Sequence, residues 1–445
     1  MYKMILQNIN NATTLIDNNE VRMLFDPWVV GKLYQNSWSP YPKQKILKKW
    51  FNKIDYIYIS HIDPDHWDIQ TIKKINKNVK IIIPNIVFNL KIKNELIKNG
   101  YKNIHMTDLS KWKTLSKNLS IYIIEPLNYC AQDFDLYQKK TEYRNIAIDT
   151  GIIVKDKISN TSHMLLGDNT PYDLKAIKRI KKKVNNSFDS LWFPYNGFAQ
   201  DYPLCYDNLS IKQKKKKSLA MSLKREKSVI NVIKELKPKY LIPHSSDFYL
   251  SGPRNKEFFK VHDQTFLNKD AYSNRIEKLT KIKSLALYGK DKIIFNKGIE
   301  KIIIGTKENE RKKIPKIEKL FFPSIKKNGK SLFEEVCKAT ENMFSVGKRL
   351  NLRMNNLNEW GFYIDIGKTK FFIDLKKRHV SRKNLRKKNY LKLKTTKTIL
   401  LCMLHKKIHM NNAMIGNYLS WERKPDLYKK SITDLLNFFH LPSSS

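Results

Sequence analysis

The sequence predicts an α/β sandwich whose functional groups lie on loops at strand ends, followed by a smaller C-terminal α+β domain. Three observations predict this arrangement. Short apolar runs typical of strands alternate with helical segments over the first 305 residues. Several of these runs end directly in Asp or His, which are typical of functional loops. A polar segment at 306–316 contains a proline and is typical of a linker, and a second set of elements begins near Ser331.

The chain length and composition support this division. A chain of 445 residues exceeds the usual size of one domain, so we expect two or three. Hydrophobic residues make up 41% of the chain, which includes 8 Trp, 22 Tyr and 21 Phe, enough for sizeable cores. We therefore expect a main domain at 1–305, a linker at 306–330 and an accessory domain at 331–445.

The individual elements follow from apolar patterning, turn residues and capping residues. In the main domain we expect strands at 12–16, 21–25, 56–59, 79–84, 119–125, 146–154, 163–166, 240–243 and 301–305. Helices are expected at 68–75, 90–98, 228–236 and 274–284, with the basic run 212–227 as a solvated loop. In the accessory domain we expect a helix at 332–350, a hairpin of 360–366 and 370–375, a basic stretch at 376–394, a strand at 398–403 and a helix at 432–440.

The run from Ser60 to Asp68 is the densest group of metal-ligand side chains in the sequence. It holds two His and three Asp within nine residues, directly after the apolar run 56–59. Imidazole suits zinc and iron, and carboxylates add charge and hard oxygen donors. A simple turn needs only one or two Asp or Pro residues. The pattern therefore predicts a metal-binding loop at a strand end.

The cysteines and the hydropathy pattern exclude several protein classes. The four cysteines are scattered without a CxxC pair, which argues against a zinc ribbon, an iron–sulfur cluster or a disulfide scaffold and favours a reducing compartment. No run of 18 apolar residues is present, so we expect no membrane span. The N-terminus lacks the apolar core and cleavage site of a signal peptide. We expect a cytoplasmic protein.

The formal net charge of +44 favours an anionic partner. The excess is mostly Lys, interleaved with Asn and Ile along the whole chain, a pattern typical of A/T-rich codon usage. Arg, the better reader of phosphates and base edges, is sparse. We therefore expect an anionic small-molecule substrate, and nucleic acid bound through the basic surface is the less favoured partner.

Three further residues follow apolar runs in the same manner as the loop: Asp26, Asp168 and His244. Together with the loop, their order and spacing resemble the metallo-β-lactamase fold, an αββα sandwich, over about residues 1–305. That family carries an early Asp, an HxHxDH loop, a further His, a bridging Asp and a final His. The resemblance implies that the metal ligands are His61, Asp63, Asp65, His66, Asp168 and His244, with Asp65 also catalytic. It implies that Asp26 supports the loop without binding metal.

The sequence departs from the family pattern at two places. Asp63 stands where the motif has its second His, and this carboxylate shifts the preference from zinc toward iron or manganese. The flavodiiron proteins also carry a carboxylate at that place. The third His is missing after 119–125, where only Asn128 or Cys130 offers a replacement. His105 and His163 do not follow the expected strand, and His405 and His409 form an HxxxH pair without the Glu of a zincin.

Three aromatic loops around these ligands predict a substrate pocket. They resemble the branch that contains the CMP-N-acetylneuraminate hydroxylases and the ascorbate-6-phosphate lactonases, although this chain has no Cys and His pairs for a Rieske cluster. The alternative role for such loops is plain packing. The substrate-binding candidates are Trp28, Trp38, Tyr195, Asn196, Tyr202 and Arg254.

The sequence as a whole predicts a metal-dependent hydrolase in which one or two zinc ions activate a water molecule. The expected substrate is anionic, such as a phosphorylated or nucleotide-linked sugar. Two alternatives stay open. The first is a non-haem iron oxygenase acting on a sugar nucleotide, suggested by Asp63. The second is a degenerate, non-catalytic fold that binds nucleic acid or an anionic surface.

Overall fold

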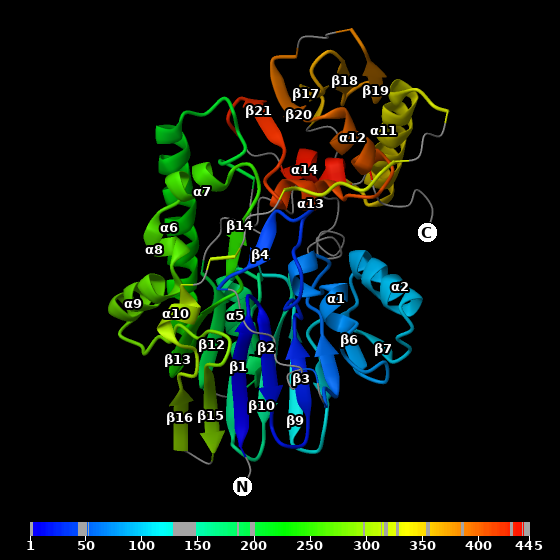
Figure 1. Cartoon of the computed structure of the whole chain (residues 1–445). Helices are drawn as coiled ribbons and strands as arrows, with labels where there is room; N and C mark the ends of the chain where they lie inside the picture. The colour runs from blue at the N-terminus through cyan, green and yellow to red at the C-terminus, as the bar shows by residue number, and fades with distance from the viewer. Residues whose placement is uncertain are drawn as a thin grey trace.

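The computed structural model arranges the chain as two facing β-sheets flanked by helices, with a third sheet beyond one end of the sandwich (Figure 1). It describes residues 3–42, 51, 53–127, 148–184, 187–195, 201–296, 299–312, 314–315, 319–325, 329–352, 357–383, 387–427, 430–437 and 439. Among the described helices, none has both the length and the hydropathy that a membrane crossing requires.

The first sheet has eight strands and combines antiparallel and parallel pairing. The pairings of β3 with β5, of β5 with β6 and of β6 with β7 are all parallel. Strands β3, β5 and β6 therefore end at the same edge of the sheet. In spatial order the strands are β16 (Ile299–Ile303), β15 (Lys292–Asn296), β1 (Met4–Asn10), β2 (Thr13–Asp17), β3 (Arg22–Phe25), β5 (Tyr56–Tyr58), β6 (Lys80–Pro84) and β7 (Ile104–Thr107).

The second sheet has six strands, of which β11, β12 and β13 run parallel to one another. In spatial order they are β13 (Tyr240–His244), β12 (Ser190–Pro194), β11 (Thr161–Leu165), β10 (Gly151–Asp156), β9 (Leu119–Ile124) and β8 (Trp112–Thr114). A short two-stranded sheet of β4 (Trp38–Pro40) and β14 (Phe248–Leu250) lies between this sandwich and the C-terminal part (Figure 1).

Buried side chains divide the sandwich into layers. Phe25 and Tyr58 of the first sheet share one hydrophobic cluster with Ile123 and Ile152 of the second, so this cluster joins the facing sheets. The outer face of the first sheet packs on α1 (Ile69–Ile72) and α2 (Leu90–Lys98). The outer face of the second sheet packs on α5 (Leu174–Val184), α6 (Ile211–Leu236) and α9 (Lys269–Thr280). This arrangement confirms the predicted αββα sandwich.

The C-terminal part forms a five-stranded sheet covered by helices. Its strands are β19 (His379–Ser381), β18 (Lys370–Asp374), β17 (Trp360–Asp365), β20 (Asn389–Lys394) and β21 (Ser420–Lys424). Its helices are α11 (Leu332–Arg349), α12 (Lys397–Leu404), α13 (Met410–Ile415) and α14 (Lys430–Asn437). The remaining helices are α7 (Asn255–Val261), α8 (Gln264–Leu267) and α10 (Glu308–Arg311).

Hydrophobic packing continues from the sandwich into the C-terminal part. One cluster joins Trp38 and Phe258 to Val336, Phe362 and Trp421. Main-chain contacts add to it, because the amide of Asp207 donates to Trp421 O at 3.0 Å. The C-terminal part is therefore docked firmly on the edge of the sandwich.

Two sequence predictions of local structure were wrong. The basic run 212–227 belongs to α6, which begins after Ser210 with a capping box to Gln213. The segment 398–403 is helical within α12, where the Thr396 hydroxyl accepts from the amide of Ile399. In both places a cap at the N-terminus favoured the helix, and the apolar run 398–403 by itself does not distinguish helix from strand.

Candidate metal centre

The loop between β5 and α1 is fixed at both ends. It leaves the buried strand β5, forms a single 3-10 turn at Pro64–His66 and enters α1. Asp68 caps that helix, accepting from the amides of Gln70 and Thr71 at 3.1 and 3.0 Å. The loop side chains are therefore positioned by regular structure on both sides.

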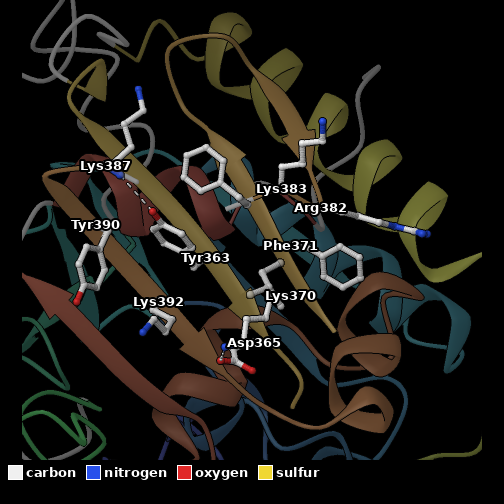
Figure 2. Close-up of a pocket in the computed structure, with 11 residues that line it drawn as sticks. Tyr363, Asp365, Lys370, Phe371, Arg382, Lys383, Lys387, Tyr390 and Lys392 are labelled. Atoms are coloured by element: carbon white, nitrogen blue, oxygen red, sulfur yellow. Dashed lines mark hydrogen bonds and ion pairs between the residues drawn. The ribbon is translucent and has the colours of Figure 1, made fainter. Parts of the chain in front are cut away.

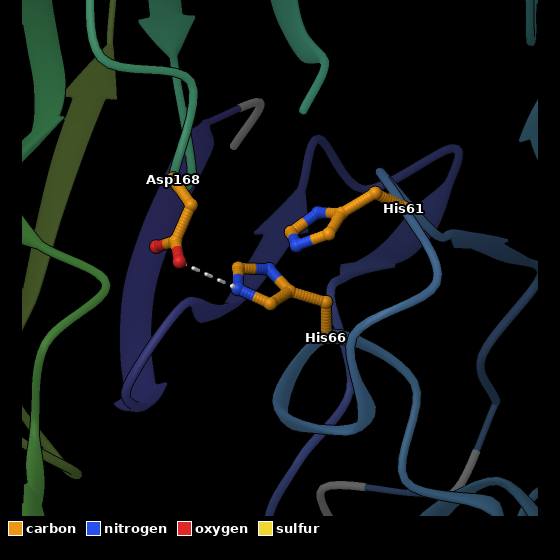
Figure 3. Close-up of side chains that lie close together, drawn as sticks. All are labelled: His61, His66 and Asp168. Carbon is orange, nitrogen blue, oxygen red and sulfur yellow. Dashed lines mark ion pairs between the residues drawn. The ribbon is translucent and has the colours of Figure 1, made fainter. Parts of the chain in front are cut away.

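His66 lies among three carboxylates. Its Nδ1 is 2.7 Å from Asp26 Oδ2, and its Nε2 is 3.3 Å from Asp65 Oδ2 and 3.5 Å from Asp168 Oδ2. Figure 3 shows the Asp168 carboxylate directed at the His66 ring. We call Asp65, His66 and Asp168 the His66 half-site.

His61 lies beside His66, with 4.1 Å between the ring centroids (Figure 3). Its Nε2 is 3.5 Å from Asp63 Oδ2 and 3.5 Å from Asp149 Oδ1. We call His61, Asp63 and Asp149 the His61 half-site. Each half-site thus contains one imidazole and two carboxylates.

Asp26 orients the whole loop. Its carboxylate accepts from the Ser60 amide, from the Ser60 hydroxyl and from His66 Nδ1, each at 2.7 Å. Asp26 and His66 are both 0% exposed. Gly167, next to Asp168, has φ +56, and a Cβ there would lie 3.2 Å from Asp26 Oδ2. A side chain at 167 would therefore crowd the carboxylate that orients His66.

These hydrogen bonds also fix the tautomers of both histidines. The Ser60 hydroxyl gives its one proton to Asp26, so at 2.8 Å it accepts from His61 Nδ1. His66 Nδ1 donates to the Asp26 carboxylate in the same way. In neutral imidazoles the proton on Nδ1 leaves Nε2 as the free donor for a metal, and both Nε2 atoms face the carboxylates.

Residues outside the loop hold the ligand carboxylates. The Tyr34 hydroxyl donates to Asp65 Oδ1 at 2.5 Å, and Asn11 Nδ2 donates to Asp65 Oδ2 at 3.2 Å. Asn411, from α13 in the C-terminal part, donates to Asp63 Oδ1 at 3.1 Å. The two carboxylates of the loop are therefore supported by different parts of the chain.

The charges of the centre shift several pKa values. Burial lowers the pKa of His66, but Asp65, Asp168 and Asp26 outweigh burial and raise that pKa well above its ordinary value. Burial raises the pKa of Asp65, yet His66 and the Tyr34 hydrogen bond bring it down to about 2. Burial, with repulsion from Asp168 and Asp63, raises the pKa of Asp149 to about 6 against the attraction of His61. The carboxylates therefore stabilise a positive charge placed among them.

The residues present fit a metal ion. His61 Nε2, His66 Nε2 and Asp168 Oδ1 are buried without a hydrogen-bond partner among the described residues. Ligand atoms of these three residues lie within 4.8 Å of one another. An unpaired buried polar atom costs about 1–3 kcal/mol, and metal coordination would remove this cost for all three.

His244 lies next to the centre but bonds elsewhere. Its Nε2 is 2.9 Å from the Thr14 hydroxyl and its Nδ1 is 3.1 Å from the Ser245 hydroxyl. Burial, together with Lys269 and His66, lowers the pKa of His244 well below its ordinary value. The structure therefore does not bring this predicted ligand into the group formed by His61, His66 and Asp168.

Asp149 is the ligand candidate that the sequence interpretation missed. It was counted within a strand at 146–154, whereas β10 begins only at Gly151. The next residue, Thr150, donates from its hydroxyl to Ser60 O at 2.8 Å, which ties this segment to the loop. The signal available in the sequence was a carboxylate just before a strand, together with the absence of the family's third His. The alternatives Asn128 and Cys130 lie outside the described residues.

The aromatic candidates for substrate binding occupy packing positions. Trp28 is buried, and Trp38 stacks on Phe248 with 3.6 Å between ring centroids. Tyr195 is buried and donates to Asp247 at 3.0 Å, and Tyr202 donates to Asp426. Among the described residues, no hydrogen bond joins these side chains to the metal centre, and their contacts lie within the sandwich and with the C-terminal part.

Arg254 is bound in ion pairs rather than available for a substrate. It pairs with Asp207 and with Glu257, each at 3.0 Å, and donates to the Ser420 hydroxyl at 2.7 Å. These contacts join the sandwich to the C-terminal part. The remaining candidate, Asn196, lies outside the described residues.

The four other histidines that the sequence analysis considered make contacts outside the centre or lie at the surface. Burial lowers the pKa of His163 to about 3, and this ring packs on Phe295. His405 is 2.9 Å from a Glu335 carboxylate oxygen, and His409 caps α13. His105 is exposed on β7.

No family model matches the chain. The chain is 27% identical over 210 residues, 46% of its length, to a protein of Mycolicibacterium smegmatis described as a Rieske 2Fe-2S iron-sulfur protein. It is 30% identical over 114 residues, 23% of its length, to the cytidine monophosphate-N-acetylneuraminic acid hydroxylase of Sus scrofa. The matches span 36% and 25% of these two relatives, so the chain covers about a third of the one and a quarter of the other.

Among solved structures, the diiron β-hydroxylase CmlA of Streptomyces venezuelae is 13% identical, with 66% of this chain and 54% of that chain covered and a TM-score of 0.45. Other similar structures are hydrolases, two of which are described as metallo or metal-dependent hydrolases. The αββα sandwich with a His and Asp loop at its strand ends is the metallo-β-lactamase-type fold that the sequence predicted, and the chain resembles CMP-N-acetylneuraminic acid hydroxylases in sequence.

Proposed function

We propose that the chain is a non-haem iron hydroxylase that acts on an anionic small molecule. The observation that carries this proposal is the donor set: two imidazoles with four carboxylates, from Asp63, Asp65, Asp149 and Asp168, within 3.3–3.5 Å of a histidine Nε2. Two His with four carboxylates is the ligand set of di-iron and di-manganese carboxylate proteins. Zinc sites use fewer oxygen donors.

The residues divide naturally into places for two ions. His61, Asp63 and Asp149 would hold one ion, and Asp65, His66 and Asp168 would hold the other. When bound, iron at such a centre supplies oxygen-dependent hydroxylation chemistry. The protein residues orient the ligands through Asp26, Ser60 and Tyr34. The most exposed ligand side chain is that of Asp168, at 33%, against 15% for Asp63 and Asp149.

The exposed side at Asp168 indicates where a substrate would approach. A substrate there meets a chain of net charge +44, which favours an anionic molecule over a neutral one. The hydroxylase of Sus scrofa acts, by its name, on a cytidine monophosphate sugar. A sugar nucleotide is therefore the first substrate class to test.

Metal analysis of protein purified without added metal tests the proposal. We expect about two iron ions per chain and oxygen consumption that depends on a sugar nucleotide such as CMP-N-acetylneuraminate. His66→Ala removes a ligand, and His105→Ala is the matched control, because His105 is exposed on β7 outside the centre. Iron without oxygen consumption on any anionic sugar would contradict the hydroxylase assignment.

A metal-dependent hydrolase is the second candidate, and one observation favours it. The Asp168 carboxylate combines a buried, unpartnered Oδ1 with a side chain that is one third exposed, so it can contact a metal and solvent together. A metal there would lower the pKa of a bound water. One or two zinc ions per chain, with hydrolysis of phosphorylated sugars in the absence of oxygen, would favour this candidate. Protein that binds neither metal would overturn both.

A further inference from the structure

The outer face of the C-terminal sheet carries aromatic and basic side chains. On β17, Phe362 and Ile364 point into the hydrophobic cluster, so Tyr363 and Asp365 lie on the opposite face. Tyr363 is paired in register with Phe372 on β18 and with Lys392 on β20. A solvent face of a sheet is usually polar throughout, and this one is instead aromatic at its centre.

A cavity of about 400 Å³ opens on this face. Its lining includes Tyr363, Phe372, Tyr390, Lys370, Arg382 and Lys383. Figure 2 shows Tyr363 and Tyr390 beside each other on neighbouring strands, with Lys387 and Lys392 next to them. The volume lies within the range of sites for single small molecules, about 300–1,000 Å³.

The aromatic rings form a continuous group across three strands. Ring centroids of Tyr363 and Phe372 are 4.9 Å apart, and those of Tyr363 and Tyr390 are 5.5 Å apart. Gly361 permits this packing, because a Cβ there would come 2.6 Å from the Phe372 ring. The Tyr363 hydroxyl accepts from the amide of Lys387 at 3.3 Å, which fixes its ring. A fixed aromatic group of this kind offers a planar ligand a surface for stacking.

The charge of the cavity is positive after its ion pairs are counted. Five cations line it: Lys370, Arg382, Lys383, Lys387 and Lys392. Three of them face carboxylates, since Lys370 is 3.5 Å from Asp365, Lys387 is 3.3 Å from Asp374 and Lys392 is 2.9 Å from Glu422.

The other two cations have no carboxylate partner among the described residues. The Arg382 guanidinium lies 4.7 Å from the centre of the Phe333 ring, and Lys383 is exposed. Lys383 is thus available to a phosphate group, whereas Arg382 is directed away from Tyr363 and Tyr390 (Figure 2).

We propose that this cavity binds a free nucleotide. Stacking on tyrosine suits any nucleobase, and the unpaired Lys383 suits the phosphate, so one ligand class satisfies both features. A volume of about 400 Å³ favours a single nucleotide over a strand of nucleic acid. The site is separate from the metal centre, and the inference does not depend on the proposed function.

Calorimetric titration of the full-length chain with AMP tests the proposal, with adenosine and inorganic phosphate as partial ligands. We expect AMP to bind more tightly than either. Tyr363→Leu should weaken AMP binding about tenfold through lost stacking. Lys383→Ala should weaken it severalfold and flatten its salt dependence. Lys383 is exposed, so this variant should stay folded, as circular dichroism would verify.

Two control variants limit the interpretation. Lys312→Ala removes an exposed lysine outside the cavity, one that pairs with Glu308 at 2.6 Å. This variant should leave AMP binding unchanged. His66→Ala should also leave it unchanged, because the metal centre is not involved. Absence of AMP binding, equal binding of phosphate alone, insensitivity to both cavity variants, or far tighter binding of a ten-nucleotide oligoadenylate would overturn the proposal.

Discussion

The His66 half-site is held more firmly than the His61 half-site, although each has one imidazole and two carboxylates. His66 Nδ1 donates to the Asp26 carboxylate, a charge-assisted hydrogen bond between two residues that are 0% exposed. His61 Nδ1 has only the Ser60 hydroxyl, a neutral acceptor that is shared with Asp26. Partners of this kind set ligand orientation and basicity, so the His66 half-site should bind metal more tightly.

The carboxylates differ in the same direction. Asp65 receives hydrogen bonds from Tyr34 and Asn11, both within the N-terminal sandwich. Asp63 and Asp149 are each 15% exposed, and Asp63 receives its described hydrogen bond from Asn411 of the C-terminal part. The first half-site therefore belongs to the sandwich alone, whereas the second depends on how the C-terminal part docks.

The largest expected effect separates the two histidines. His66→Ala should remove the tightly held ion and reduce the activity of the metal-loaded protein to background. His61→Ala should leave about one ion per chain, because the His66 half-site stays intact. Elemental analysis after gel filtration measures both variants. If His61→Ala lost more metal than His66→Ala, the order of the two half-sites would be reversed.

The next effect concerns the residue that orients His66. Asp26→Asn keeps the shape of the side chain but loses its charge, and it should weaken metal binding about 10–100-fold at the His66 half-site. Competition with a chromophoric chelator measures the affinity. Asp68→Asn is a suitable control, because Asp68 lies in the same loop and caps α1 without touching either half-site. Equal weakening by both variants would indicate loop unfolding rather than lost orientation.

A smaller effect should come from the C-terminal part. Asn411→Ala removes the donor to Asp63 and should weaken the His61 half-site by about 1.5 kcal/mol, or roughly tenfold. The same chelator competition should show an unchanged His66 half-site. Asn412→Ala is the matched control on the same helix turn, since no contact joins Asn412 to the loop among the described residues. An unchanged second binding step would show that docking does not support the centre.

The difference between the half-sites also explains what the sequence could predict. The loop, Asp26 and Asp168 were identified because each follows an apolar run, and parallel strands end at one edge of their sheet. Asp149 was missed because it precedes its strand and belongs to no local motif. The sequence thus named all three members of the His66 half-site, whereas the His61 half-site contains Asp149, which it did not name.

Contacts between distant segments determine where two other predicted site residues lie. His244 lies at a strand end, as expected. Its Nε2 is hydrogen-bonded to the hydroxyl of Thr14, 230 residues away, and not to a member of the cluster. Trp38 was assigned to a pocket, yet its indole donates to Ile415 O, 377 residues away. Such pairings are set by docking and leave no periodic pattern in the sequence, so residue type alone could not reveal them.

The smallest effect distinguishes the half-sites by pH in metal-free protein. Burial, with Asp168 and Asp63, raises the pKa of Asp149 to about 6, above the value of about 3.9 for an unfolded Asp. Between these two values, Asp149 binds a proton in the folded state but not in the unfolded state. The stabilisation of the folded state that this proton provides is lost as the pH rises through 6. The free energy of unfolding of the wild type should fall by about 1 kcal/mol more than that of Asp149→Asn between pH 5 and 6. Urea denaturation of chelator-treated protein measures this difference.

The firmer half-site should behave oppositely, and Asp65→Asn provides that control. The pKa of Asp65, which burial raises, is lowered to about 2 by His66 and Tyr34, so its carboxylate is ionised in both the folded and unfolded states from pH 5 to 6. Asp65→Asn should therefore reduce stability by a similar amount at every pH in this window, because the lost contacts with Tyr34 and Asn11 do not titrate there and His66, whose pKa is lowered by burial but also raised by Asp168 and Asp26, stays protonated. A pH-dependent loss for Asp65→Asn would mean that His66 itself titrates in this window. A constant one for Asp149→Asn would mean that Asp149 does not hold a proton in the metal-free centre.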